Sequence, residues 1–271
     1  MDASVGLLPL PRPLMTAEVL DAAFRLFRAG ILRCLPYSGL VVLVLELPTL
    51  YSTFFAPALG IGAAIPYFTL VSYAVVFVLS VPLLGVMTLR LNALASGVRP
   101  RFRTELAAAL WRWPMGLFAT AFAFGFPLFL AWLRPALINT LPATALIFVA
   151  VPLLWPTALF VVALPAFWCD GLTPIAALVQ SLRLTIRRSW RMFGAILATV
   201  CMVSVFLMLS TVIVWMMSPL FGRADLFLMA TVQSTLFLVV GAFGVPFVLA
   251  VLMVAYQDLV LREQDRRGVR A

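Results

Sequence analysis

Histidine and lysine are both absent from the 271-residue sequence, and acidic residues number only ten. Without histidine the chain has no imidazole general base, no histidine metal ligand and no serine–histidine triad. The three cysteines, Cys34, Cys169 and Cys201, are far apart and form no Cys-x-x-Cys pair. They predict neither disulfides nor a zinc site, and we interpret them as small apolar residues, with Cys201 buried in a membrane span. We expect no catalytic site, metal or cofactor.

Charge of either sign is scarce. Charged residues make up 11% of the chain, 64% of its residues are hydrophobic, and its mean hydropathy is +1.12. Soluble proteins carry about a quarter charged residues, so this composition predicts an all-α integral membrane protein. The net charge of +9 comes from 19 arginines that lie between apolar runs rather than in one basic domain. This pattern favours anionic phospholipid head groups as partners and argues against nucleic acid.

Apolar runs long enough to cross a membrane recur along the sequence. About 20 apolar residues are needed for each crossing. The runs predict six transmembrane helices, at roughly 35–55, 66–89, 113–133, a segment ending near 168, 192–217 and 228–257.

The predicted spans lie within one domain, residues 16–262. Residues 1–15 are expected to form a flexible, proline-rich leader. Residues 263–271 form a charged tail that is expected to extend the last helix out of the membrane.

The distribution of arginine predicts the orientation of these spans. Seventeen arginines fall in segments on one side of the predicted spans, and only Arg134 and Arg223 fall on the other side. Arginine and lysine concentrate in cytoplasmic loops. We therefore expect a multi-pass membrane protein with both termini in the cytoplasm.

The stretch from 164 to 205 contains a basic amphipathic segment between two apolar runs, an arrangement that recurs along the sequence. Thr173 is expected to cap a helix with Pro174 at its first position. The helical periodicity gives an apolar stripe of Ile175, Val179, Leu182, Ile186 and Trp190, and a polar stripe of Gln180, Arg183, Arg187 and Arg191. Such a helix lies along a membrane surface or packs under a bundle.

The arginines of this stretch form one candidate site. Arg183, Arg187, Arg188 and Arg191 are candidates for binding an anionic head group or an acidic partner. Alternatively, they only fix the orientation of the neighbouring spans.

Two other amphipathic segments precede predicted spans. One starts at Thr16 and the other at Thr104, and each threonine is expected to cap a short surface helix. The pattern Leu20-x3-Phe24-Arg25-Leu26 recurs as Leu178-x3-Leu182-Arg183-Leu184. We interpret this as a weak repeat of three helix–span–span units, with chance similarity of apolar helices as the alternative.

Glu46 is the only charged residue between Arg33 and Arg90. It lies eleven residues past Leu35, about 16 Å into a span, close to the middle of a hydrocarbon core about 30 Å thick. Intramembrane carboxylates often mark ion or proton paths. The alternative is a protonated, hydrogen-bonded glutamate that serves structure alone.

Three segments carry a resemblance to a known family. They are LDAAFRLFRAGILRCLP (20–36), CDGLTPIAALVQSLRLTIRRSWR (169–191) and YQDLVLRE (256–263). Together they resemble YciC-like inner-membrane proteins and the membrane-domain family of the glycerophosphoryl diester phosphodiesterases. The resemblance covers most of 16–265 and implies a six-helix bacterial membrane protein. In the phosphodiesterases, catalysis belongs to a separate soluble domain that this sequence does not contain, so the resemblance implies a fold rather than an activity.

Three classes of function follow from these patterns. The first is a non-enzymatic scaffold or assembly factor of the cell envelope, which holds membrane proteins or lipids. The second is a transporter or lipid-handling protein with a cavity around Glu46. The third, an intramembrane enzyme, is the weakest because the residues supply no nucleophile–base pair.

Overall fold

The chain is helical wherever the structure describes it. The computed structural model describes residues 10, 12–50, 66–98, 101–123, 155, 157–217 and 226–268. Its helices are α1 (Thr16–Leu50), α3 (Pro66–Ala95), α4 (Phe102–Trp111), α7 (Ala163–Cys169), α8 (Pro174–Thr185), α9 (Ser189–Met217) and α10 (Leu226–Arg266). Residues 113–123 are also helical. These ranges contain no β-strand, which confirms the all-α prediction for this part of the chain.

Four helices are long and apolar enough to cross a membrane. They are Thr16–Pro48, Ala74–Ala95, Ser189–Met216 and Thr231–Arg266, and a shorter apolar helix covers Thr157–Cys169. These lengths are compatible with a membrane protein. The predicted third and fourth spans fall in part on residues 124–154, outside the described residues, so neither is described over its full length.

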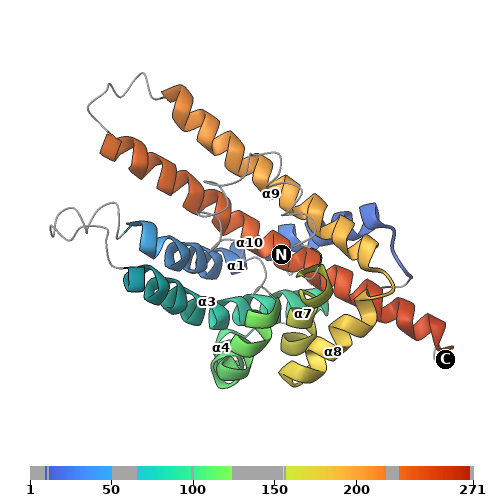
Figure 1. Cartoon of the computed structure of the whole chain (residues 1–271). Helices are drawn as coiled ribbons and strands as arrows, with labels where there is room; N and C mark the ends of the chain where they lie inside the picture. Colours follow the sequence, from blue (N-terminus) through green and yellow to red (C-terminus); the bar gives the residue numbers. More distant parts are fainter. Residues whose placement is uncertain are drawn as a thin grey trace.

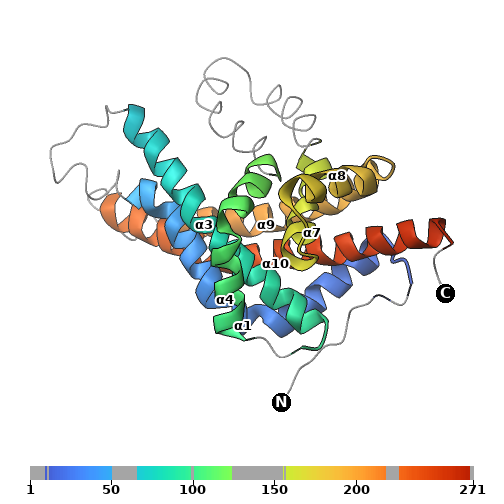
Figure 2. The same ribbon diagram turned by 90° about the horizontal axis from the view of Figure 1, so that it is seen from below.

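The predicted surface helix and the first predicted span form a single helix, α1. The expectation of two separate elements was wrong, because no residue in 16–50 ends the helix. Pro36 lies inside α1. A proline removes one backbone hydrogen bond and bends a helix without ending it when the flanks are good helix formers. Figure 2 shows α1 changing direction near its middle.

Helices α9 and α10 lie side by side and run in opposite directions along one edge of the bundle (Figure 1). α10 packs most extensively against α1, which in turn packs against α3. α10 continues without a break to Arg266, past the predicted end of the span, as the sequence pattern indicated. Its C-terminal turns project beyond the other helices in both views.

The sequence correctly predicts the start of α8. The Thr173 hydroxyl accepts a hydrogen bond from the Ala176 N–H at 3.4 Å, and Pro174 is the first helical residue. Gly171, with a φ of +72°, supplies the left-handed residue that ends the preceding helix.

The long helix predicted between 174 and 191 is interrupted. α8 ends at Thr185, and α9 begins at Ser189. The predicted apolar stripe therefore spans two helices. Its residues are exposed except for the half-buried Leu182, with Trp190 at 76%, whereas Ser181 and Thr185 of the same segment are buried.

Two predicted helix caps were wrong. At the start of α1 the Glu18 carboxylate, rather than the Thr16 hydroxyl, accepts from a backbone N–H, that of Met15, at 2.7 Å. Thr104 lies inside α4, and its hydroxyl donates to the Arg101 carbonyl. In both cases the helix begins close to the threonine, but a different residue occupies the cap position.

Trp168 of α7 lies at the centre of the helix packing and is only 2% exposed. Its indole ring fills the space above two glycines, Gly85 of α3 and Gly116. A Cβ added to Gly85 would lie 2.7 Å from the ring, and one added to Gly116 would lie 2.8 Å from it. The two glycines therefore make the pocket that holds this tryptophan.

Candidate functional site: an aromatic groove and a buried charge cluster

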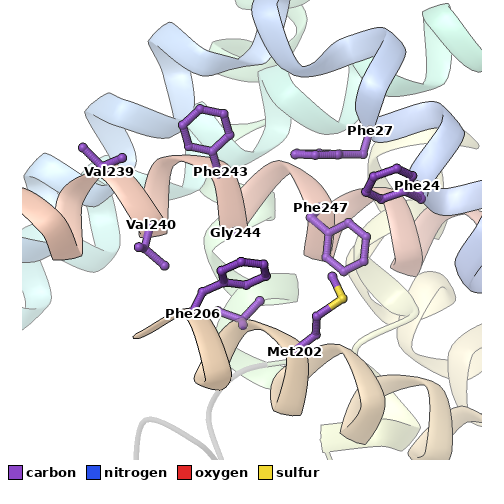
Figure 3. Close-up of a pocket in the computed structure, with 10 residues that line it drawn as sticks. Phe24, Phe27, Met202, Phe206, Val239, Val240, Phe243, Gly244 and Phe247 are labelled. Carbon is purple, nitrogen blue, oxygen red and sulfur yellow. The ribbon is translucent and has the colours of Figure 1, made fainter. Parts of the chain in front are cut away.

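A groove that could hold a ligand lies between α1, α9 and α10 (Figure 3). We call it the aromatic groove. Its volume is about 470 Å³, and it is lined mainly by Phe24, Phe27, Met202, Phe206, Phe243 and Phe247. Every side chain that lines it is apolar, and the other lining residues are valines and Gly244.

Aromatic contacts hold two walls of the groove together. The Phe27 ring of α1 meets the Phe247 ring of α10 edge-on, with centroids 5.6 Å apart. Phe24, one turn before Phe27, stays 52% exposed at the rim. Aromatic pairs in this geometry stabilise helix contacts beyond the area that they bury. The groove is therefore a formed surface feature that opens sideways from the bundle.

Two glycines of α10 give the groove its shape. A Cβ on Gly241 would lie 2.9 Å from Val42, so Gly241 allows α1 to approach α10 closely. Gly244 lies on the floor of the groove, where an added Cβ would meet Val203 of α9 at 3.4 Å. A larger residue at 244 would extend into the space of the groove.

The outward side of α9 is covered by no described helix. Its a/d-spaced residues, which we call the α9 flank, are Ala198, Cys201, Val205, Met208, Val212 and Trp215, all exposed. Met208, for example, is 70% exposed. Cys201 belongs to this flank and is not covered by the described helices, so its predicted burial within a membrane span stays a prediction. Apolar side chains on this flank are suited to lipid or to another apolar surface.

The structure separates the four predicted site arginines. Arg183 and Arg187 are exposed, and Arg188 is half-buried. Arg183 lies beside Glu263 and Arg267 along a polar groove between α8 and α10. Arg191 instead points inward and pairs with Asp258 at 3.4 Å. The four side chains therefore do not form one binding surface.

Asp258 is the centre of a buried charge cluster that includes Arg191. It is 2% exposed and accepts from Arg262 at 2.9 Å and from the Leu14 N–H at 2.7 Å. The Leu14 carbonyl accepts from both Arg191 and Arg262. This end of the predicted flexible leader is thus anchored to α9 and α10.

Asp170, which follows α7, is bound by a tyrosine hydroxyl. In the described part of the chain its carboxylate accepts from the Tyr256 hydroxyl, which in turn accepts from Gln180 at 2.8 Å. Nearby, Arg112 donates to the Leu172 carbonyl at 2.8 Å and stacks over the Phe167 ring at 4.4 Å. Burial lowers the pKa of Arg112 from its ordinary value. Together these contacts fix the turn between α7 and α8.

A second buried ion pair joins α3 and α4. Arg90 and Glu105 approach to 2.9 Å and are both largely buried. Arg90 also donates to the Arg33 carbonyl of α1 at 2.9 Å and lies over the Tyr37 ring. The sequence does not predict this pair. The two residues are fifteen positions apart, whereas helical periodicity predicts contacts only between residues three or four positions apart.

Glu46 is half-buried on α1 and does not line the aromatic groove. Gly39, seven residues earlier on α1, faces open space. The predicted role of Glu46 as an intramembrane acid stays a prediction.

Sequence reasoning did not identify the aromatic groove, although its signal is present in the sequence. Met202 and Phe206 are four residues apart, as are Phe243 and Phe247, and Phe24 and Phe27 are three apart. Each pair therefore lies on one face of its helix. What the sequence does not supply is which of these faces meet.

Comparisons with known proteins add no assignment: no protein-family model, curated protein or solved structure matches the chain.

Proposed function

We propose that the chain is a six-span protein of the bacterial cytoplasmic membrane with both termini in the cytoplasm. The charge clusters support this topology. Arg191, Arg262 and the segment at Leu14, which the arginine distribution assigns to the cytoplasm from three separate parts of the chain, meet at Asp258. Arg90 likewise contacts the Arg33 carbonyl. Segments that share one side of a membrane are expected to meet in this way.

Thiol labelling in intact cells tests this topology. Cys34 is fully buried and Cys201 faces outward from the apolar flank, so neither reports on a water-filled side. In a cysteine-free variant, Thr104→Cys on the exposed face of α4 should resist a membrane-impermeant maleimide until the cells are permeabilised. Arg223→Cys, on the predicted outer turn, should react from outside. Labelling of residue 104 in intact cells would reverse the orientation.

We further propose that the protein acts as a non-enzymatic scaffold or assembly factor of the cell envelope. The α9 flank carries this proposal. Among the four long helices that the structure describes, α9 is the least buried, with 11% of its most apolar stretch buried. A helix held at the edge of a bundle, with an a/d-spaced apolar face turned outward, is suited to pack against a helix of another membrane protein.

Co-purification from native membrane tests the scaffold proposal. The full chain is extracted with its surrounding lipid, and the retained proteins are identified by mass spectrometry. Changing Val205, Met208 and Val212 to alanine on the α9 flank should reduce the yield of specific partners severalfold. Matched alanine changes at Leu40, Leu43 and Leu47, exposed on α1, should not. Equal yields from both variants would reject α9 as the docking face, and recovery of lipid alone would reject the scaffold.

The aromatic groove favours a second candidate, a lipid-handling protein. A groove lined only by apolar side chains has no group to bind a polar solute or an ion. It therefore supports contact with lipid rather than a transport path. Transport around Glu46 rests on the sequence pattern alone.

A further inference from the structure

The aromatic groove lies at a depth that lipid chains reach. Phe24 and Phe27 alternate on α1 with Arg25 and Arg28, which the arginine distribution assigns to the cytoplasmic side, so this end of the groove lies at the inner-leaflet head groups. From Phe247 the groove continues along α10 to Val239, eight residues or about 12 Å deeper, a distance that an acyl chain covers. This step rests on the proposed topology.

The size and chemistry of the groove favour one kind of occupant. A helix with its side chains is about 10–12 Å across, so a volume of about 470 Å³ holds no more than about one turn of it. A flexible hydrocarbon chain fills the same space along its length. The lining offers no hydrogen-bond donor or acceptor side chain, so the part of a ligand that enters must be hydrocarbon.

A cation lies beside the rim of the groove. Arg28 follows Phe24 by one helical turn, which makes the two side chains neighbours on α1. The Arg28 side chain is exposed, and it forms no ion pair with any residue that the structure describes, whereas the nearby Arg25 is paired with Asp21. A guanidinium group next to an apolar groove complements a phospholipid, whose phosphate can bind the guanidinium while an acyl chain enters the groove.

We infer that the aromatic groove binds one acyl chain of an anionic phospholipid, with Arg28 contacting its phosphate. The first half of α1 then serves as the head-group side of the site, and Phe24 and Phe27 lie between the head group and the chain. Met202 and Phe206 of α9 and Phe243 and Phe247 of α10 contact the hydrocarbon.

Photo-crosslinking in nanodiscs tests the acyl-chain contact. The delipidated full chain is reconstituted with phosphatidylglycerol that carries a diazirine near the middle of one acyl chain, and labelled peptides are mapped by mass spectrometry. Labels, mapped to single residues, should concentrate on Met202, Phe206, Phe243 and Phe247 over Val205, Met208 and Val212 of the equally apolar α9 flank. A uniform distribution over all lipid-facing helices would overturn the site.

Filling the groove provides the matched comparison. Gly244→Leu should reduce groove labelling about tenfold, the effect of displacing roughly two buried methylene groups. Gly194→Leu makes the same change on α9 where an added Cβ meets nothing, and it should leave groove labelling unchanged. If Gly244→Leu does not fold, Gly244→Ala fills part of the same space. Undiminished labelling in a folded Gly244 variant would contradict the proposal.

The head-group contact is tested separately. The parent should label about fivefold more with diazirine phosphatidylglycerol than with the matching phosphatidylcholine, the effect of one arginine near an anionic head group. Arg28→Gln should bring that ratio to about one, whereas Arg187→Gln, which removes an exposed arginine of α8–α9, should not. An unchanged ratio in Arg28→Gln would reject Arg28 as the phosphate contact. None of these results depends on the protein partners, so the scaffold proposal can fail or stand independently.

Discussion

Replacing Trp168 with alanine is expected to lower the free energy of unfolding by about 3–5 kcal/mol. The indole is almost completely buried and fills a pocket whose walls include two glycines, Gly85 and Gly116. Neither glycine has a side chain that could move into the space, so the cavity would persist after the substitution. The Phe167 ring, which meets the indole edge-on at 4.8 Å, would also lose its partner.

Thermal unfolding in detergent, followed by circular dichroism, measures this effect. Trp111→Ala is the matched control, because Trp111 is 87% exposed and its removal leaves no cavity within the protein. The control should unfold close to the parent temperature. Equal shifts for the two variants would mean that Trp168 does not fill an internal cavity.

Asp258→Asn is expected to destabilise the protein by about 3 kcal/mol. The substitution keeps an oxygen that can accept from the Leu14 N–H but removes the charge opposite Arg191 and Arg262. Two partly buried guanidinium groups would then face each other without a carboxylate between them. Asp258→Ala also removes the acceptor for Leu14, so it should additionally speed hydrogen exchange at the Leu14 amide.

Asp21→Asn provides the comparison for this charge cluster. Asp21 and Arg25 have the same four-residue spacing as Asp258 and Arg262, but they pair on the exposed face of α1. Exposed pairs contribute little to stability. The Asp21 variant should therefore unfold like the parent. A similar loss in both variants would show that burial does not strengthen the Asp258 cluster.

The sequence predicted the helices well, because long apolar runs between charged segments determine them. The starts of α3, α8 and α9 fall within a few residues of their predicted positions. Boundaries were wrong where a local break depends on tertiary packing. Pro36 only bends α1, whereas 186–188, which contains no proline or glycine, interrupts the predicted long helix.

The direction in which α8 faces was also not predictable by the rule used for soluble proteins. That rule assigns the apolar stripe to the interior. Here the interior side carries Ser181 and Thr185, whose hydroxyls both donate to the Leu159 carbonyl, while Ile175 and Val179 face outward. In an apolar surrounding, polar side chains form hydrogen bonds inside the helix bundle, and apolar side chains can face outward.

The contacts of the candidate site depend on long separations that leave no trace in sequence periodicity. Phe24 and Phe243, which line the same groove, are more than 200 positions apart. Single helices show which residues share a face, as they do for Phe243 and Phe247. Only the packing of α1 against α10 shows that these faces meet.

The Asp258 cluster joins the part of the chain that is synthesised first to the part that is synthesised last. Leu14 leaves the ribosome among the first residues, yet its partners on α10 are separated from it by 244 positions and emerge only when the chain is nearly complete. Until then the start of α1 lacks its anchor, and Val42 lacks the glycine face of α10 against which it packs. A chain released before α10 is made would keep these surfaces open. The last helix therefore completes the packing of the first, and a protease that recognises unfilled helix faces could distinguish truncated from full-length molecules.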